Sequence, residues 1–390
     1  MRTTFLIAAS TLALTAYCSC ASGEGTPSSP YADKSELTAS EAEAYSDYLT
    51  ERWKDSVKTA TGIPFEEKVI SMGEYSMKLA WKVFGEKPSD GRSLYISLHG
   101  GGGVPPEDND QQWENQQRLY KPEEGVYLCP RAITDSWDLH FRPQSDAFYG
   151  EIIRMAVAHL DVNPDKVYLM GYSAGGDGVW RLAPRMADTW AAASMMAGHP
   201  GDVSLVNLRN LPFMIWCGAL DEAYERNLRC AERISEMDSL HENDPEGYVH
   251  EGHIVEGKAH WMDLEDAAAV PWMAKYSRNT RPQRIVWRQG DVMKKDFYWT
   301  GIDENEAEKG KEVIVNRSGN TLTIESCDYS RLVFHLDDKV ADLDKPVTVI
   351  FGGNVLFEGM VTRSPAVMRK SLREREDPGY IFCSELTVNL

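Results

Sequence analysis

Short apolar runs alternate with amphipathic segments through the middle of the chain, between residues 75 and 276. The runs are bounded by turn residues, as buried strands are, whereas the longer segments between them have helical periodicity. Strands that alternate with helices form a mostly parallel, doubly wound sheet covered on both faces, so the predicted class is α/β. The predicted strands are 75–84, 93–98, 125–129, 166–170, 191–196, 211–217 and 248–255, and the predicted helices are 145–160, one after Ser173, 224–240 and 263–276.

The pattern changes on both sides of this region. Before it, residues 22–38 are small, polar and proline-containing, like a tether, and a helix follows with a capping box predicted between Ser40 and Glu43. After residue 281 helical periodicity vanishes, and eight short strand-like runs separated by turns predict a small β-sandwich. The predicted units are a tether and helix over 22–64, an α/β domain over 65–280 and an accessory β-domain over 281–390. One face of the predicted helix is apolar through Tyr45, Leu49, Trp53 and Val57.

The first 21 residues predict a secretory signal, because one charge, Arg2, precedes a short apolar stretch and then small residues. We therefore expect an exported protein, either secreted, periplasmic or a surface lipoprotein. Cys18 or Cys20 could carry a lipid, and plain cleavage near Ala21 or Gly23 is the alternative. The apolar stretch is too short to span a bilayer, so any membrane attachment is expected through an N-terminal lipid only.

The composition and charge of the chain limit which partners and substrates are expected. With 41 Lys+Arg and 60 Asp+Glu the net charge is -19, and 42% of the residues are hydrophobic. This is a globular composition, and its acidity argues against nucleic acid as a partner and modestly against anionic substrates. Five cysteines follow the predicted signal, an odd number, so no disulfide framework is expected. The one pair that could form an isolated disulfide is Cys327 with Cys383.

The strongest motif is Gly171-Tyr172-Ser173-Ala174-Gly175, a G-x-S-x-G placed between a predicted buried strand and a predicted helix. In this setting a sharp turn lifts the serine above the edge of the sheet, and glycines are needed where the backbones approach closely. Upstream, another strand runs into His99 and four glycines, 100–103. Glycines after a strand let backbone N–H groups face a reacting centre, which suits an oxyanion hole shared with Ala174. A phosphate-binding loop is excluded because no Lys-Ser/Thr follows.

A nucleophilic serine needs a base, and the base needs a carboxylate that orients it. The strand over 211–217 ends in a Gly-x-x-Asp turn that places Asp221 at the same edge of the sheet as Ser173, and His260 lies in a loop after the next strand. Asp221 and His260 are therefore the predicted acid and base. The weaker candidates are Glu222, Asp202 and Asp263 for the acid and His199, His250 and His253 for the base.

These residues resemble the α/β-hydrolase superfamily, and within it secreted esterases similar to polyhydroxybutyrate depolymerases and feruloyl esterases. The resemblance covers about residues 75–276. It implies Ser173 as nucleophile, His260 as base and acid, Asp221 as its orienting partner, and oxyanion donors among Gly100, Gly101 and Ala174. Ala259 departs from the glycine that more often precedes the histidine, and the C-terminal β-region is not part of the basic fold.

The expected function is hydrolysis of small or polymeric carboxylic esters through an acyl-enzyme, without a cofactor. No metal is expected either, because His250-Glu251-Gly252-His253 has the wrong spacing for two ligands on one helix face. The alternatives are a serine peptidase similar to prolyl oligopeptidases and an inactive glycan-binding homologue. Aromatic residues near the expected site could stack on a sugar or an aromatic acyl group, although packing is an equal explanation. These residues are Trp113, Trp137, Tyr172 and Trp261.

Overall fold

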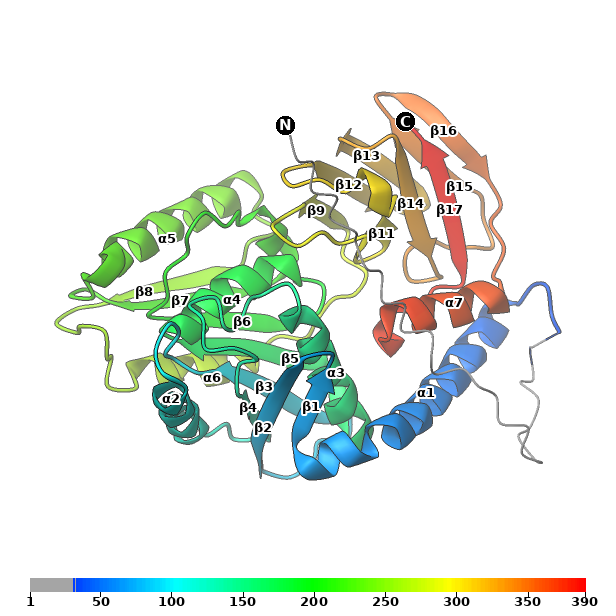
Figure 1. Ribbon diagram of the computed structural model, residues 1–390. Coiled ribbons are helices and arrows are strands. Elements are labelled where there is room, and N and C mark those ends of the chain that lie inside the picture. Colours follow the sequence, from blue (N-terminus) through cyan, green and yellow to red (C-terminus); the bar gives the residue numbers. More distant parts are fainter. Residues whose placement is uncertain (1–30, 32) are drawn as a thin grey trace, which may run out of the picture.

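The computed structural model describes residue 31 and residues 33–390 (Figure 1). The predicted signal and most of the predicted tether lie outside these residues. The α/β class is confirmed: an eight-stranded sheet has the order β1-β2-β4-β3-β5-β6-β7-β8, in which β1, β2 and β4 pair antiparallel and the pairs from β4 to β8 are parallel. The strands are β1 (Val69–Met72), β2 (Tyr75–Phe84), β3 (Arg92–Leu98), β4 (Gly125–Pro130), β5 (Val162–Tyr172), β6 (Ala192–Met196), β7 (Phe213–Gly218) and β8 (His250–Val255).

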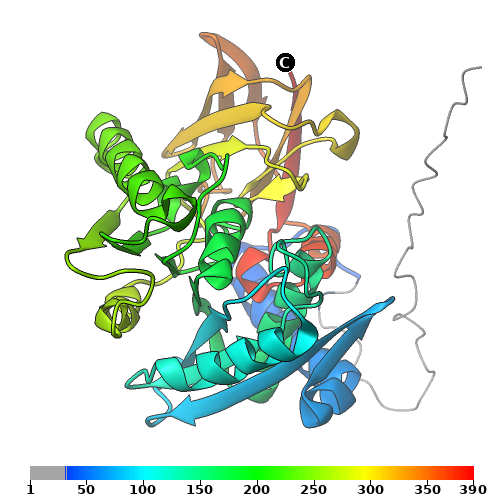
Figure 2. The same cartoon turned by 60° about the vertical axis from the view of Figure 1, so that its left-hand side comes forward.

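Helices cover both faces of this sheet, because its central strands are apolar on both sides. Alternate residues of β3, such as Leu94 and Ile96, belong to the core that also contains buried residues of α3, α4 and α5, whereas Tyr95 belongs to the opposite core under α2 and α6. Figure 2 shows α2 lying along the sheet on the face opposite α4. The helices are α2 (Pro106–Leu119), α3 (Ser145–His159), α4 (Ala174–Arg185), α5 (Arg226–Asn243) and α6 (Ala269–Met273). Three-residue to five-residue 3₁₀ turns also occur: η1 (Val206–Asn210), η2 (Ala223–Glu225) and η3 (Glu265–Ala268).

The N-terminal helix, α1 (Ala39–Glu67), joins the two halves of the molecule (Figure 1). Its N-terminal cap differs from the prediction: Thr38 and Glu41 form the capping box instead of Ser40 and Glu43. Both pairs have the same spacing, and the helix begins at the earlier one because Leu37 is buried just before it. The helix packs against α3 and against α7 of the C-terminal region, where Arg369 donates a 2.9 Å hydrogen bond to the Tyr45 hydroxyl.

The C-terminal region contains two sheets of four and five strands, ordered β10-β11-β14-β17 and β16-β15-β13-β12-β9. The prediction of an all-β region was wrong in one respect, because α7 (Pro365–Arg375) lies within it. Ser364 caps this helix, and Met368 and Leu372 are the only large apolar side chains among its buried residues, so it carries little apolar signal. The strands are β9 (Arg284–Arg288), β10 (Asp296–Phe297), β11 (Thr300–Gly301), β12 (Glu312–Ser318), β13 (Thr321–Cys327), β14 (Arg331–Leu336), β15 (Val347–Phe351), β16 (Asn354–Gly359) and β17 (Ser384–Asn389), with 3₁₀ turns η4 (Glu304–Glu306) and η5 (Pro378–Tyr380).

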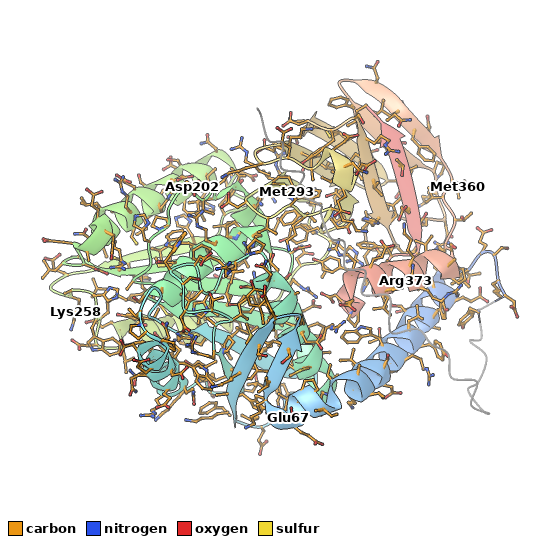
Figure 3. All side chains as sticks on the ribbon, viewed as in Figure 1. Glu67, Asp202, Lys258, Met293, Met360 and Arg373 are labelled. Atoms are coloured by element: carbon orange, nitrogen blue, oxygen red, sulfur yellow. The ribbon has the colours of Figure 1, made fainter. Side chains whose placement is uncertain are left out.

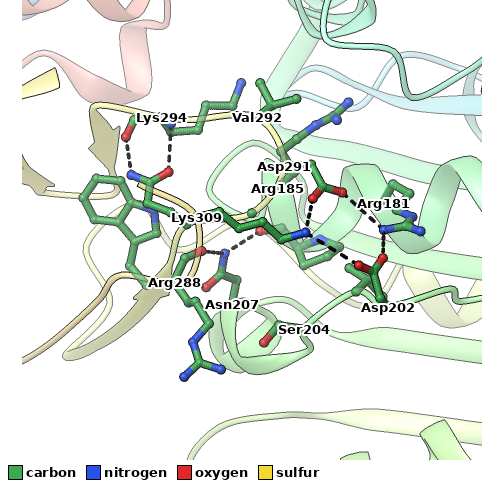
Figure 4. A pocket seen from close by; sticks show the side chains of 16 residues that line it. Arg181, Arg185, Asp202, Ser204, Asn207, Arg288, Asp291, Val292, Lys294 and Lys309 are labelled. Atoms are coloured by element: carbon green, nitrogen blue, oxygen red, sulfur yellow. Dashed lines mark hydrogen bonds and ion pairs between the residues drawn. The ribbon is translucent and has the colours of Figure 1, made fainter. Parts of the chain in front are cut away.

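Buried charge joins this β-domain to the α/β domain. Arg278, which is almost fully buried, pairs with Asp377 at 2.6 Å and with Asp165 at 2.9 Å, and its guanidinium lies over the Tyr380 ring. Figure 3 places Asp202 on the side of the α/β domain that faces the β-domain. There, a cavity of about 250 Å³ separates the two domains, and Figure 4 shows the Lys309 side chain crossing it toward Asp202 and Asp291.

Two sequence expectations concern cysteines and membranes. All five cysteines of the described chain are free thiols, so Cys327 and Cys383 form no disulfide. The Cys383 Sγ contacts the Leu336 carbonyl and the Cys327 Sγ the Tyr329 carbonyl, so each packs separately. Among the described helices, none has an apolar stretch long enough to cross a bilayer.

Candidate active site

Ser173 lies at the turn between β5 and α4, in a strained backbone conformation with φ of 59° and ψ of -122°. A side chain at Gly171 would meet the carbonyl carbon of Gly175 at 2.6 Å, and one at Gly175 would meet the carbonyl carbon of Leu98 at 2.6 Å. Only glycine therefore allows β3, β5 and α4 to approach this closely. The strained turn presents the serine at the carboxyl edge of the sheet and at the N-terminus of α4, where the helix dipole favours negative charge.

His260 connects this serine to a buried carboxylate. Its Nε2 lies 2.9 Å from the Ser173 Oγ, and its Nδ1 lies 2.7 Å from the Asp221 Oδ2. Because an ionised carboxylate can only accept, Nδ1 carries the proton and Nε2 is free to accept the serine proton. The Asp221 side chain is only 1% exposed. The three predicted residues thus form one hydrogen-bonded relay.

Close backbone packing holds Asp221 and His260 together. Gly218, at the end of β7, lies against the loop that carries His260, since a side chain there would meet the carbonyl carbon of Ala259 at 2.9 Å. The Tyr172 hydroxyl donates a 2.6 Å hydrogen bond to the His260 carbonyl and accepts one from the N–H of Met262. Tyr172, predicted as a substrate contact, is thus buried and supports the base loop.

The weaker candidates for acid and base have other contacts. Glu222 is exposed, Asp202 pairs with Arg181 at 2.7 Å, and Asp263 pairs with Lys258 at 2.8 Å. His250 contacts Asp238, and the His253 ring stacks on Trp216 with centroids 4.0 Å apart. Among the described residues, no three His, Cys, Asp or Glu side chains come close enough together to hold a metal ion.

Two buried histidines fix the glycine loop above Ser173. The His99 Nδ1 donates to the Gly100 carbonyl at 2.6 Å, and its Nε2 accepts the N–H of Ala132 at 3.1 Å. Burial lowers the pKa of His99 to about 3, so the ring stays neutral. The His140 Nε2 donates to the His99 carbonyl at 2.8 Å. Among the described residues, neither ring has a hydrogen bond to Ser173, Asp221 or His260, and both rings hold the loop in place.

The four glycines differ in whether their N–H groups already have hydrogen-bond partners, one of which is Asn109 on α2. Its Oδ1 accepts the N–H of Gly102 at 2.9 Å, and the N–H of Gly103 donates to the Asp135 carbonyl at 2.8 Å. Among the described residues, the N–H groups of Gly100 and Gly101 have no such partner. Gly101, with φ of 105°, lines both cavities beside Ser173. The geometry therefore leaves Gly101, with Gly100 as neighbour, and Ala174 as the available donors.

Two cavities meet at Ser173. One, of about 330 Å³, contains both Gly101 and Ala174 and extends toward Arg181 and Arg226. The other, of about 590 Å³, contains His260 and extends along α2. Ser173 and Gly101 line both. A substrate bound across the serine therefore has one space on the His260 side and another on the opposite side.

The aromatic residues predicted near the site divide between these cavities. Trp137, 66% exposed, lines the smaller cavity, and Trp261, 46% exposed, lines the larger one together with Tyr172. Trp113 lines neither: its indole N–H donates to the Cys129 carbonyl, so it is a packing residue. Trp137 and Trp261 remain free to contact a substrate.

Sequence reasoning did not find Arg226 and Tyr224, which line the smaller cavity. The Arg226 Nη1 lies 3.6 Å from the Asp221 Oδ1, on the carboxylate oxygen that His260 does not use. The guanidinium packs against the Tyr224 ring at 4.9 Å. An arginine five residues after the acid carries no recognisable pattern, because its importance depends on the shape of the cavity.

The order of the strands and the serine at the turn between β5 and α4 define the α/β-hydrolase fold. Comparison with protein-family models and with curated proteins gives no match. Among solved structures, the chain is similar to a thermostable esterase, with 20% identity over 54% of this chain and 62% of that chain and a TM-score of 0.41. It is also similar to a phospholipase/carboxylesterase from Dyadobacter fermentans, with 16% identity over 52% of this chain and 99% of that chain and a TM-score of 0.38. A third similar structure is a ferulic acid esterase, with 15% identity over 51% of this chain and 97% of that chain and a TM-score of 0.34.

Proposed function

We propose that the protein is a serine hydrolase that cleaves carboxylic esters through a covalent acyl-enzyme. The observation that supports this proposal is the hydrogen-bonded relay from Ser173 through His260 to Asp221, with distances of 2.9 and 2.7 Å. A serine hydroxyl is a weak nucleophile until a base removes its proton. In this relay the base is within reach of the hydroxyl and is held in the tautomer that can accept the proton.

In the first half of the reaction, the Ser173 Oγ attacks the carbonyl carbon of the ester while the His260 Nε2 takes the serine proton. The negative charge that develops on the carbonyl oxygen is stabilised by the N–H groups of Gly101 and Ala174 and by the N-terminus of α4. His260 then gives its proton to the alcohol oxygen as the bond between that oxygen and the carbonyl carbon breaks. The alcohol leaves, and the acyl group remains on Ser173.

In the second half, water takes the place of the alcohol. His260 removes a proton from the water, the resulting hydroxide adds to the acyl carbon, and the Ser173 Oγ leaves with the proton returned by His260. Asp221 stabilises the imidazolium that forms in each half. The products are a carboxylic acid and the regenerated serine.

From these steps we infer which part of the substrate each of the two cavities holds. His260 must protonate the leaving alcohol oxygen, so the alcohol occupies the larger cavity, which His260 lines. The acyl group then occupies the smaller cavity beside Gly101 and Ala174, hereafter the acyl cavity. The exposed Trp137 and Trp261 lie at opposite sides of the serine and are proposed contacts for the two halves of a substrate, such as a polysaccharide-linked or polymeric ester outside the cell.

The experiment that tests the function is labelling of the protein with a fluorophosphonate probe, followed by assays with acetyl, butyryl and feruloyl esters and with matched amides. We expect Ser173→Ala to lose both labelling and ester turnover, whereas Ser204→Ala, a control at a serine that lines the cavity between the domains, keeps both. Labelling that persists in the Ser173→Ala variant, or a folded protein that is never labelled, would contradict the proposal. Faster turnover of amides than of esters would instead indicate a peptidase.

A further inference from the structure

Arg226 is a nearly buried arginine with few partners. Its side chain is 11% exposed and lines the acyl cavity. Among the described residues, its polar contacts are one 3.4 Å hydrogen bond from Nη1 to the Ala223 carbonyl and the 3.6 Å approach to Asp221, and its guanidinium also lies over the Tyr224 ring. Its Nε is buried and has no hydrogen-bond partner there. A guanidinium has five N–H donors, and leaving them unfilled away from bulk water is unfavourable, so an acceptor within the cavity would be bound strongly.

His199 adds a second donor to the same cavity. Its Nδ1 accepts the N–H of Gly201 at 3.0 Å, so the proton of the neutral ring is on Nε2. Burial also lowers the pKa of His199, which favours this neutral form. Asp177 is the only carboxylate among the residues that line the cavity, and its Oδ1 already accepts the backbone N–H of His199 at 2.6 Å.

Arg181 completes the group of donors, although its Nη1 already pairs with Asp202 at 2.7 Å and with Asp291 at 3.4 Å. The far side of the cavity therefore has two guanidinium groups and an imidazole against one carboxylate. The carboxylates that pair with these arginines, Asp202, Asp291 and Asp221, are not among the residues that line the cavity. A molecule bound in the cavity therefore meets mainly hydrogen-bond donors, of which the buried Arg226 Nε has no partner among the described residues.

We propose that the acyl cavity selects esters whose acyl group ends in a carboxylate, which pairs with Arg226 and accepts a hydrogen bond from the His199 Nε2. This rests on the proposed ester hydrolysis, and the terminal carboxylate is bound without reacting. The aromatic side walls, Trp137, Phe141 and Tyr224, allow the segment between the two carboxyl groups to be either an alkyl chain or a benzene ring. The substrate class is thus a monoester of a dicarboxylic acid.

Two sets of esters of matched size test this. In the linear set, monoethyl glutarate is compared with ethyl glutaramate, which ends in a neutral amide, and with ethyl 5-methylhexanoate, which ends in an alkyl group of similar shape. The aromatic set is monomethyl terephthalate, methyl terephthalamate and methyl 4-isopropylbenzoate. The measured quantity is the ratio of kcat/KM between the carboxylate ester and its neutral partners. A hydrogen bond or ion pair to a charged group corresponds to a ratio of about 10 to 100.

We expect the wild-type protein to prefer the carboxylate ester by at least about tenfold in one set. Arg226→Met should abolish that preference and His199→Phe should reduce it. Because Arg226 also contacts Asp221, its replacement lowers the turnover of every ester, and the ratio removes this shared effect. The Arg226→Lys variant keeps a positive charge and should retain part of the preference.

Either of two outcomes would overturn the inference: a wild-type ratio below about tenfold against the neutral partners in both sets, or a preference that survives Arg226→Met. In each of these cases the esters are still hydrolysed, so the proposed function stands. If instead no ester is hydrolysed and Ser173 is not labelled by the fluorophosphonate, the proposed function itself has failed. The two failures are therefore distinguishable.

Discussion

Replacing Asp221 with asparagine tests the relay most directly, because the surroundings of this carboxylate determine how the amide must orient. The Arg226 Nη1 faces one carboxylate oxygen at 3.6 Å, and the His260 Nδ1 faces the other at 2.7 Å. In the variant, the amide oxygen should turn toward the positively charged Arg226. The amide NH₂ would then face Nδ1 and donate to it, so the His260 proton would move to Nε2.

With its proton on Nε2, His260 can no longer accept the proton of Ser173. In triads of this geometry the wrong tautomer lowers kcat by about 10⁴, which is roughly 5 kcal/mol of transition-state stabilisation. The assay is kcat on a neutral ester, together with fluorophosphonate labelling, for Asp221→Asn and for the control Glu222→Gln. Glu222 is the adjacent exposed carboxylate, so its replacement should change kcat less than twofold, a change of about 0.4 kcal/mol.

The reasoning would be refuted if Asp221→Asn reduced kcat less than tenfold while the circular dichroism of the variant matched the wild type. It would also be refuted if Glu222→Gln reduced kcat as much as Asp221→Asn. A further variant, Asp221→Asn combined with Arg226→Gln, tests the orientation argument. Without the guanidinium the amide can rotate, so this double variant should lose less kcat than the two single effects multiplied together.

Three further predictions concern stability and can be measured by urea unfolding. Gly175→Ala forces a methyl group against the end of β3 and should lower the free energy of unfolding by about 3 kcal/mol, whereas Gly150→Ala, where a methyl group meets nothing within 4 Å, should not destabilise. Equal effects at the two glycines would contradict this. Arg278→Met removes the buried partner of Asp377 and should cost about 3 kcal/mol, and a loss below 1 kcal/mol would show that water replaces the guanidinium. Burial lowers the pKa of His99 to about 3, below the value of about 6.5 for an unfolded histidine. Between these two pH values the unfolded state binds more protons than the folded state. The free energy of unfolding therefore decreases as the pH falls from about 6.5 toward 3. His99→Gln should flatten this part of the curve of unfolding free energy against pH, by up to about 1.4 kcal/mol per pH unit, and an unchanged slope would argue against a buried neutral ring.

Most of the sheet could be predicted from the sequence, because its central strands, such as β4, β6 and β7, are buried along their whole length and read as continuous apolar runs. The predicted strand 75–84 has the same bounds as β2, and the predicted helix 145–160 ends one residue beyond α3. The predicted helix 263–276 was too long, since the chain there forms η3 and the short α6. The helix α2 was missed because its buried residues, Asn109 and Gln116, are polar and give no apolar stripe.

The candidate site was also predicted only in part from the sequence. The chain order of serine, acid and base, with each residue after a predicted strand, led to the three residues that the fold brings together. Sequence reasoning could not choose among the four glycines, because neighbouring glycines are equivalent until their N–H partners are known. Asn109 resolves this choice by occupying the N–H of Gly102. Arg226 could not be found, because its few partners are a property of the folded cavity.

The contacts between the domains indicate how the β-domain can influence the site without touching the relay. Arg181 lines both the acyl cavity and the cavity between the domains, and it contacts Asp291 of the β-domain as well as Asp202. Lys309 bridges the same two carboxylates from the β-domain (Figure 4). These exposed pairs contribute little to stability and are weakened by salt, whereas the buried Arg278 holds the domains together. The exposed network therefore acts mainly on the position of Arg181, so under the proposed function the β-domain should affect which acyl groups bind rather than the geometry of the Ser173–His260–Asp221 relay.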